Sequence, residues 1–166
     1  VMIQSANDGC IALAEGIAGN ETEFVRMMND RAREIGLTKS YFTNVDGLPD
    51  PKMRVTPREL SQIARHIVLN YPDYYKWFGE REFTWNKIRQ LNRNPLLTMD
   101  IGADGLKTGN IDESGFGLVG SATQGGQRLI RPEAMLRAPG TDGNDGFQPG
   151  IGGRKHPFTK VGDQIG

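Results

Sequence analysis

Apolar residues recur at helical spacing in the first part of the chain. After Asn7, the pattern of Cys10, Ile11, Leu13, Ala14 and Ile17 continues until Gly19 and predicts a buried helix. A second helix is expected from about Thr22 to Ile35, with Gly36 as its C-terminal stop. Its apolar side would be formed by Phe24, Met27, Met28 and Ile35, so both methionines are expected in the core.

A third helix has the clearest start signal. Thr56-Pro57-Arg58-Glu59 combines an N-cap, a proline at the first helical position and a glutamate that would complete a capping box. The apolar residues that follow are Leu60, Ile63, Ala64, Ile67 and Val68. His66 lies in this helix without a second ligand at metal spacing, and the other histidine, His156, lies in a dissimilar region. The sequence therefore predicts no metal site and no cofactor.

Strand patterns dominate the second half. Short strands are expected at Arg81–Trp85 and Ala103–Gly109. Phe116, Leu118, Gly120 and Ala122 alternate on one side, and Gln124-Gly125-Gly126 then turns the chain into Gln127–Ile130. This hairpin makes the sheet antiparallel, so we predict an α+β fold with a helical lobe packed on an antiparallel sheet.

Proline and glycine become frequent after Ile130 and disfavour a long helix there. They are Pro132, Pro139, Gly140, Gly143, Gly146, Pro149, Gly150, Gly152, Gly153 and Pro157. We expect a domain over residues 1–130 and a divergent or irregular tail over residues 131–166, to which no chemistry is assigned.

Composition excludes several partners. Among 166 residues, 20 are Lys or Arg and 20 are Asp or Glu, so no net charge favours nucleic acid. Cys10 is the only cysteine and is expected to be a buried small hydrophobic residue. The apolar run Val1-Met2-Ile3 enters the next turn directly, from which we expect a domain that is incomplete at its N-terminus.

Two short motifs bear on chemistry: Ser5-Ala6-Asn7, and Lys107-Thr108-Gly109 preceded by Asp104-Gly105-Leu106. Penicillin-interacting serine acyltransferases combine Ser-x-x-Lys, Ser-x-Asn and Lys-Thr-Gly. The first motif is missing, because the residues three positions after the serines are Asp8, Thr43, Ala64, Gly117 and Gln124. The nucleophile is thus expected outside this chain, in a missing N-terminal segment or a companion chain.

Longer segments carry a family resemblance over most of Val1–Ile130. Residues 5–10 resemble the Ser-x-Asn-Asp-Ala stretch of the low-molecular-mass D-alanyl-D-alanine carboxypeptidases, in which the asparagine caps a helix. Residues 44–51 and 55–60 resemble the Asn-x-x-Gly-Leu loop and the helix start after it. Residues 92–97 resemble the Asn-x-Asn-x-Leu-Leu segment that leads to the Lys-Thr-Gly strand. The order of these segments agrees with the family throughout.

The resemblance implies a β-lactamase/transpeptidase-like fold, in which the site lies between the helical lobe and a five-stranded sheet. It also implies a penicillin-sensitive serine carboxypeptidase that removes the terminal D-alanine of peptidoglycan stem peptides through an acyl-enzyme. Peptidoglycan stem peptides and β-lactams would be its ligands. The family is located in the bacterial cell envelope, in the periplasm or otherwise outside the cytoplasmic membrane.

Matched positions inherit roles from the family. The catalytic residues would be Ser5, Asn7 and Lys107, with Ser5 relaying protons and Asn7 donating its amide to the substrate backbone. The substrate-binding residues would be Arg93, Thr108, Gly109 and Asn110. Arg93 and Thr108 would hold the terminal carboxylate, and the Asn110 N–H would be an oxyanion donor. Asn110-Ile111 departs from the family's usual aromatic or histidine followed by threonine, which leaves fine specificity open.

Alternatives remain for the residues and for the domain. Ser5 and Asn7 are residue types that cap helices, and a lysine on an edge strand blocks aggregation. The domain could be a non-catalytic peptidoglycan-binding or scaffold module. It could also be a β-lactamase, with Glu82 and Asn86 at a superficially suitable spacing, although that segment reads as a strand.

Overall fold

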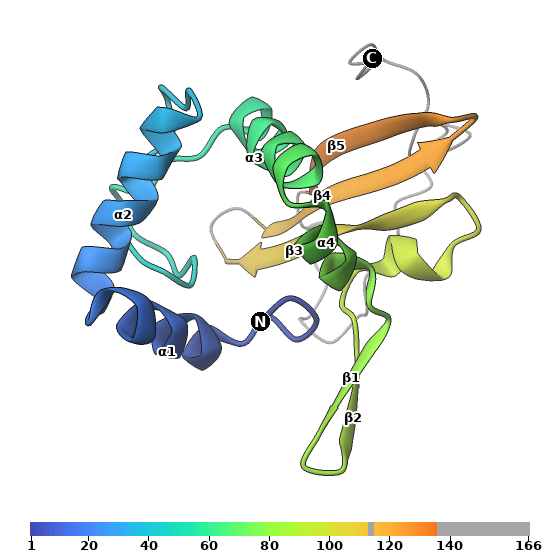
Figure 1. Cartoon of the computed structure of the whole chain (residues 1–166), viewed down its shortest axis with the longest axis horizontal. Coiled ribbons are helices and arrows are strands. Elements are labelled where there is room, and N and C mark those ends of the chain that lie inside the picture. Colours follow the sequence, from blue (N-terminus) through green and yellow to red (C-terminus); the bar gives the residue numbers. More distant parts are fainter. Residues whose placement is uncertain (113–114, 136–166) are drawn as a thin grey trace.

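The computed structural model describes residues 1–112 and 115–135, which form an α+β arrangement (Figure 1). The helices are α1 (Asn7–Ala18), α2 (Glu21–Glu34), α3 (Pro57–Asn70) and α4 (Pro72–Tyr75), with short 3-10 helices η1 (Lys76–Gly79) and η2 (Pro95–Thr98). The strands are β1 (Glu82–Trp85), β2 (Ile88–Leu91), β3 (Ala103–Ile111), β4 (Gly115–Gln124) and β5 (Gln127–Met135). The predicted fold class is confirmed.

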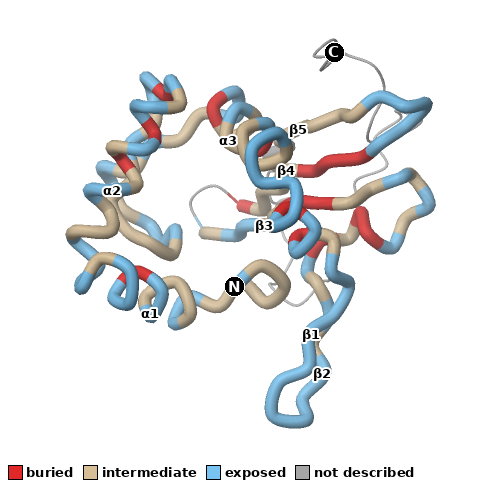
Figure 2. Tube along the Cα trace, in the orientation of Figure 1, coloured by how far each residue is buried: buried red, intermediate tan, exposed pale blue. Residues whose placement is uncertain are grey.

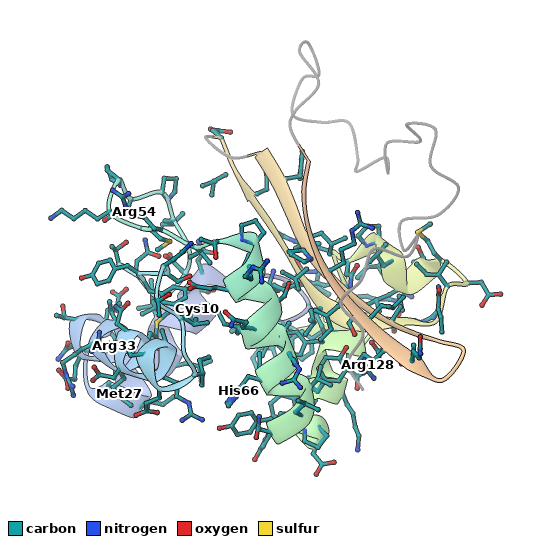
Figure 3. The ribbon with its side chains drawn as sticks, turned by 90° about the horizontal axis from the view of Figure 1, so that it is seen from above. Cys10, Met27, Arg33, Arg54, His66 and Arg128 are labelled. Carbon is teal, nitrogen blue, oxygen red and sulfur yellow. The ribbon has the colours of Figure 1, made fainter. Side chains whose placement is uncertain are left out.

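One antiparallel sheet has the order β3-β4-β5, so β3 is an edge strand of the described part. α3 packs against β5 and lies between the α1–α2 pair and the sheet (Figures 1 and 3). The predicted hairpin is present, with Gly125 and Gly126 at φ 56° and 77° in its turn. β5 continues to Met135, five residues past Ile130, and most of the predicted tail lies outside the described residues.

The main core forms between α3 and the sheet. Ala64, Tyr75, Phe78 and Leu106 are buried together. Val119 of β4 and Ile130 of β5 pack against them from the two strands of the hairpin. Figure 2 shows the buried stretches concentrated on β3 and β4. This packing fixes β3, which carries the Lys-Thr-Gly motif, against the helical part of the molecule.

The prediction that the first helix is buried was wrong. Only Ala14 of α1 is buried, whereas Leu13 and Ile17 are 54% and 62% exposed. Cys10 is partly exposed rather than buried. The described residues cover one side of α1, where it packs on α2. Helical spacing identifies residues that share a face, but it does not reveal whether another element covers that face.

The second helix differs less from its prediction. α2 starts at Glu21, one residue before the expected Thr22, because the Asn20 side chain accepts a hydrogen bond from the Glu23 N–H at 2.9 Å. Met28 is partly buried, but Met27 is 41% exposed. The expectation of two core methionines therefore holds only in part.

Half of the predicted capping box is present at α3. Thr56 Oγ1 accepts from the Glu59 N–H at 3.2 Å, and Pro57 is the first helical residue. Glu59 does not complete the box. Its carboxylate accepts from the backbone N–H groups of Thr38 and Lys39 at 2.8 and 2.9 Å and from the Ser40 hydroxyl. These bonds, the one from Ser40 first, lower the pKa of Glu59 and tie the preceding loop to α3.

β1 confirms the strand predicted near residues 81–85, and its partner β2 was not predicted. The two strands pair with each other and are joined by Asn86 and Lys87, both in the left-handed region with φ 48° and 65°. Glu82 forms an ion pair with Arg89 across the hairpin. The hairpin projects from the body of the molecule and is exposed along most of its length (Figures 1 and 2).

Candidate active site

The Ser-x-Asn motif forms the turn before α1. Ser5 has φ 59°, a left-handed conformation that is uncommon for a residue other than glycine, and its N–H donates to the Val1 carbonyl at 3.0 Å. The N-cap of α1 is Ala6, which makes no side-chain cap. Asn7 is the first helical residue, and its amide instead donates weakly to Asp46 Oδ2 at 3.4 Å. Helix capping by Ser5 or Asn7 is therefore ruled out.

Lys107 reaches the Ser-x-Asn turn from the edge strand. Its Nζ donates to Ser5 Oγ at 2.5 Å and to the Thr108 carbonyl at 2.7 Å. Burial lowers the pKa of Lys107, and the positive charge of Arg93 lowers it further. The arrangement makes Lys107 a cation that is less costly to deprotonate than an exposed lysine and that contacts a hydroxyl directly.

A cleft of about 650 Å³ opens where these two segments meet. All seven residues proposed from the sequence line it: Ser5, Asn7, Arg93, Lys107, Thr108, Gly109 and Asn110. The other described lining residues are Asp46, Gly47, Leu48, Ile111, Gly115, Phe116 and Gly117. Sequence reasoning matched the loop of residues 44–51 to the family but proposed no site residue in it. The sequence pattern did not reveal that this loop lies at the cleft.

Gly109 and Asn110 lie on the exposed part of β3. A Cβ atom at Gly109 would have no protein atom within 4 Å, so the space beside it is open. Asn110 pairs with Phe116 of β4. Because β3 is an edge strand of the described sheet, alternate N–H groups along it have no strand partner. The edge can therefore accept an extended ligand.

Arg93 is held by the asparagines on either side of it. The Asn92 amide donates to the carbonyls of Phe78 and Glu80 at 3.3 and 2.8 Å. The Asn92 side chain also accepts from the Asn94 N–H at 2.9 Å, and the buried Asn94 caps η2 through the Leu96 N–H at 3.0 Å. The Asn-x-Asn segment thus fixes the backbone that presents Arg93 to the cleft.

A polar cluster fixes β3 three residues before Lys107. Asp104 Oδ1 accepts from the Tyr75 hydroxyl at 2.7 Å and from Arg128 at 2.9 Å, and Arg128 also donates to Ser121 Oγ at 2.8 Å. Burial alone would raise the pKa of Asp104, but the hydrogen bonds from Arg128 and Tyr75 outweigh it and the pKa is lowered. A Cβ at Gly105 would come 2.7 Å from the Tyr75 hydroxyl, so only glycine permits this contact.

Other candidate chemistry finds no support in the cleft. Glu82 and Asn86 do not line it, and Glu82 is paired with Arg89 on the projecting hairpin. His66 contacts Arg31 and Asn70 between α2 and α3. Within residues 1–112 and 115–135, no three His, Cys, Asp or Glu side chains are grouped as metal ligands would be. Over the same residues, no helix is long and apolar enough to cross a membrane.

Known proteins resemble this chain over the part that builds the cleft. DacC of Escherichia coli (strain K12), a D-alanyl-D-alanine carboxypeptidase, is 45% identical over 131 residues, covering 78% of this chain and 33% of that protein. Penicillin binding protein 5 from Haemophilus influenzae is 43% identical with a TM-score of 0.75, over 77% of this chain and 38% of that one. Penicillin-Binding Protein D2 from Listeria monocytogenes, in its ampicillin-bound form, is 28% identical with a TM-score of 0.70, over 81% and 57%.

The chain spans about a third of the length of curated relatives such as DacC and DacD of Escherichia coli (strain K12). The family model for D-alanyl-D-alanine carboxypeptidase matches residues 1–133, which include every residue of the described cleft. Motif order, fold and identity agree over the same residues, and the chain belongs to the D-alanyl-D-alanine carboxypeptidase family.

Proposed function

We propose that this chain supplies half of the active site of a serine-type carboxypeptidase that removes the terminal D-alanine of peptidoglycan stem peptides. The observation that carries the proposal is the 2.5 Å contact between Lys107 Nζ and Ser5 Oγ inside the cleft that also contains Arg93 and Thr108. A cation that polarises a hydroxyl beside carboxylate-binding groups suits cleavage next to a C-terminus.

The nucleophile comes from outside these 166 residues, because no serine in them is followed by lysine at the required spacing. In the complete enzyme it attacks the carbonyl carbon of the penultimate D-alanine. This chain alone is therefore inactive. The segment with Ser-x-x-Lys, in the same polypeptide or a companion chain, is its necessary partner.

The residues of this chain stabilise and protonate the reacting groups. Arg93, Thr108 and the Lys107 ammonium bind the terminal carboxylate. Asn7 holds the peptide backbone, and the Asn110 N–H donates to the oxyanion as the acyl-enzyme forms. Ser5 passes a proton, supplied along the contact with Lys107, to the departing D-alanine amine.

β-Lactams are the second ligand class that we propose for this cleft. The Listeria relative was solved with ampicillin bound, and the open edge of β3 offers the same extended path to a cyclic amide with a carboxylate. Glu82 does not line the cleft, so it is not placed to activate a water there. This supports a persistent acyl-enzyme rather than penicillin hydrolysis. As its relatives are bacterial, we place the enzyme in the cell envelope, outside the cytoplasmic membrane.

The test is D-alanine release from a peptide ending in D-alanyl-D-alanine, measured with the complete protein. The native protein should release D-alanine, and Lys107→Ala should reduce kcat/KM by roughly 100-fold or more. Lys76→Ala is a matched control, because Lys76 is an exposed lysine paired with Asp73 away from the cleft. Binding of the peptide without turnover by the native protein would favour the non-catalytic binding module instead.

A further inference from the structure

Charge is distributed unevenly in the cleft. Among its described lining residues only three are charged: Arg93, Lys107 and Asp46. Arg93 comes from the segment between β2 and η2 and Lys107 comes from β3, whereas Asp46 comes from the loop between α2 and α3. A ligand that fills the cleft therefore meets positive charge from one part of the fold and a single carboxylate from another.

The loop that carries Asp46 is fixed by its own hydrogen bonds. The Asn44 side chain donates to the Leu48 carbonyl at 2.8 Å and accepts from the Gly47 N–H at 2.8 Å. Gly47 has φ 80°, which a side chain would strain. Asp46 Oδ1 accepts from the Leu48 N–H at 3.3 Å. The backbone and one oxygen of Asp46 are thus held in place at the cleft wall.

The other carboxylate oxygen of Asp46 is weakly engaged. Oδ2 accepts a hydrogen bond from the Asn7 amide at 3.4 Å, which is long for a charge-assisted hydrogen bond. No lysine, arginine or histidine of the described residues forms an ion pair with Asp46. The carboxylate keeps the capacity to accept from a cation that enters with a ligand.

We propose that Asp46 is a specificity residue that binds a side-chain ammonium of the peptide substrate, upstream of the D-alanyl-D-alanine end. The inference rests on the proposed function and assigns to Asp46 the recognition of an amino group on a side chain before the D-alanyl-D-alanine end. Arg93 and Lys107 bind the carboxylate, and Asp46 receives the ammonium. A neutral or acidic side chain at that position loses this contact.

The decisive experiment compares two peptides that differ only in whether the side-chain amine is free or acetylated. Release of D-alanine by the complete protein gives kcat/KM for each. The native enzyme should prefer the free amine about fivefold, in line with a partly exposed ion pair. Asp46→Asn should bring the ratio close to one, and Asp46→Glu should restore a preference because it keeps the charge.

Asp50→Asn is the matched control. Asp50 belongs to the same loop and accepts from the Lys52 N–H at 2.7 Å, but it does not line the cleft. This variant loses the same charge and should keep the native ratio. A native ratio of one, an unchanged ratio in Asp46→Asn, or an equal loss in Asp50→Asn would each overturn the inference.

Failure of the proposed function gives a different result. The native protein would then release D-alanine from neither peptide, whatever the state of the amine. Calorimetric affinities of the same two peptides still decide the inference in that case. Tighter binding of the free amine, lost in Asp46→Asn, supports it, and equal affinities overturn it.

Discussion

Lys107 Nζ lies 2.5 Å from Ser5 Oγ, although 102 positions separate the two residues along the chain. The contact joins the edge strand of the sheet to the turn before α1, so it spans the two parts of the fold that border the cleft. In the proposed mechanism, the ammonium would stabilise negative charge on the hydroxyl oxygen as a proton leaves it. The proton relay that we propose between these two side chains requires this contact.

Ser5 should show separate effects of its hydroxyl and its backbone. Ser5→Ala and Ser5→Gly both remove the hydroxyl, so both should slow acylation by a penicillin by roughly 100-fold. Only glycine relieves the φ of 59°, so Ser5→Gly should be more stable than Ser5→Ala by about 1 kcal/mol. Urea unfolding of the two variants measures this difference, and equal stabilities would contradict strain at Ser5.

The pH dependence of acylation should reveal the lowered pKa of Lys107. As pH rises through that pKa, the ammonium loses its proton and carboxylate binding weakens. The alkaline limb of kcat/KM should therefore lie below the ordinary lysine value of 10.5. Lys107→Arg, which stays charged, should move the limb upward if activity remains measurable. If the alkaline limb lies at the same pH in the native protein and in Lys107→Arg, the limb reports the titration of another group.

Folding stability should also depend on the Lys107 pKa, with a defined sign. Between the lowered folded pKa and the ordinary value, the unfolded chain binds more protons than the folded one. The free energy of unfolding should therefore rise with pH in that window, and the rise should be smaller in Lys107→Met. Urea titrations across the window measure it.

Gly109→Ala separates ligand binding from folding. No protein atom lies within 4 Å of the added Cβ and the φ of Gly109 is not positive, so stability should change by less than about 0.5 kcal/mol. The methyl group would instead occupy space that a ligand on the edge of β3 needs, and acylation should slow by about tenfold or more. Gly102→Ala is the contrasting variant, because its Cβ would lie 2.3 Å from the Thr123 carbonyl and should impair folding.

Asp104→Asn should destabilise the protein at neutral pH. Asp104 and Arg128 are 37% and 27% exposed, so solvent screening limits the loss to about 1–2 kcal/mol. Because the folded pKa is lowered, the native stabilisation is complete above the ordinary aspartate pKa and disappears as pH falls through the folded value. The free energies of unfolding of the native protein and of Asp104→Asn should therefore become similar in strong acid. Asp73→Asn, which breaks an exposed pair with Lys76, should change little.

The elements that were predicted best are those whose ends are marked by residues next to each other in the sequence. Thr56 and Pro57 mark the start of α3 through short-range backbone chemistry, and Gly125-Gly126 marks the hairpin turn in the same way. The meeting of Ser5 and Lys107 was expected from the family resemblance, not from spacing. No rule of local structure connects residues 102 positions apart.

What the sequence did not reveal depends on tertiary contacts. The Glu59 carboxylate accepts hydrogen bonds from a loop about 20 residues earlier in the chain. It therefore does not complete the capping box that its position predicted. β2 was missed because Asn86-Lys87 lacks the glycine usual in a two-residue turn. Asp46 reaches the cleft only through the path of its loop, and the exposure of Leu13 depends on what covers α1.

Intact-mass measurement of the purified complete enzyme, before and after exposure to a penicillin, shows directly which polypeptide carries the nucleophile. Under denaturing conditions, the mass of every chain is measured separately. We expect the drug's mass on the polypeptide that contains Ser-x-x-Lys, and no gain of mass on residues 1–166 expressed alone. Labelling of the isolated chain, or no labelling of the complete enzyme, would contradict it.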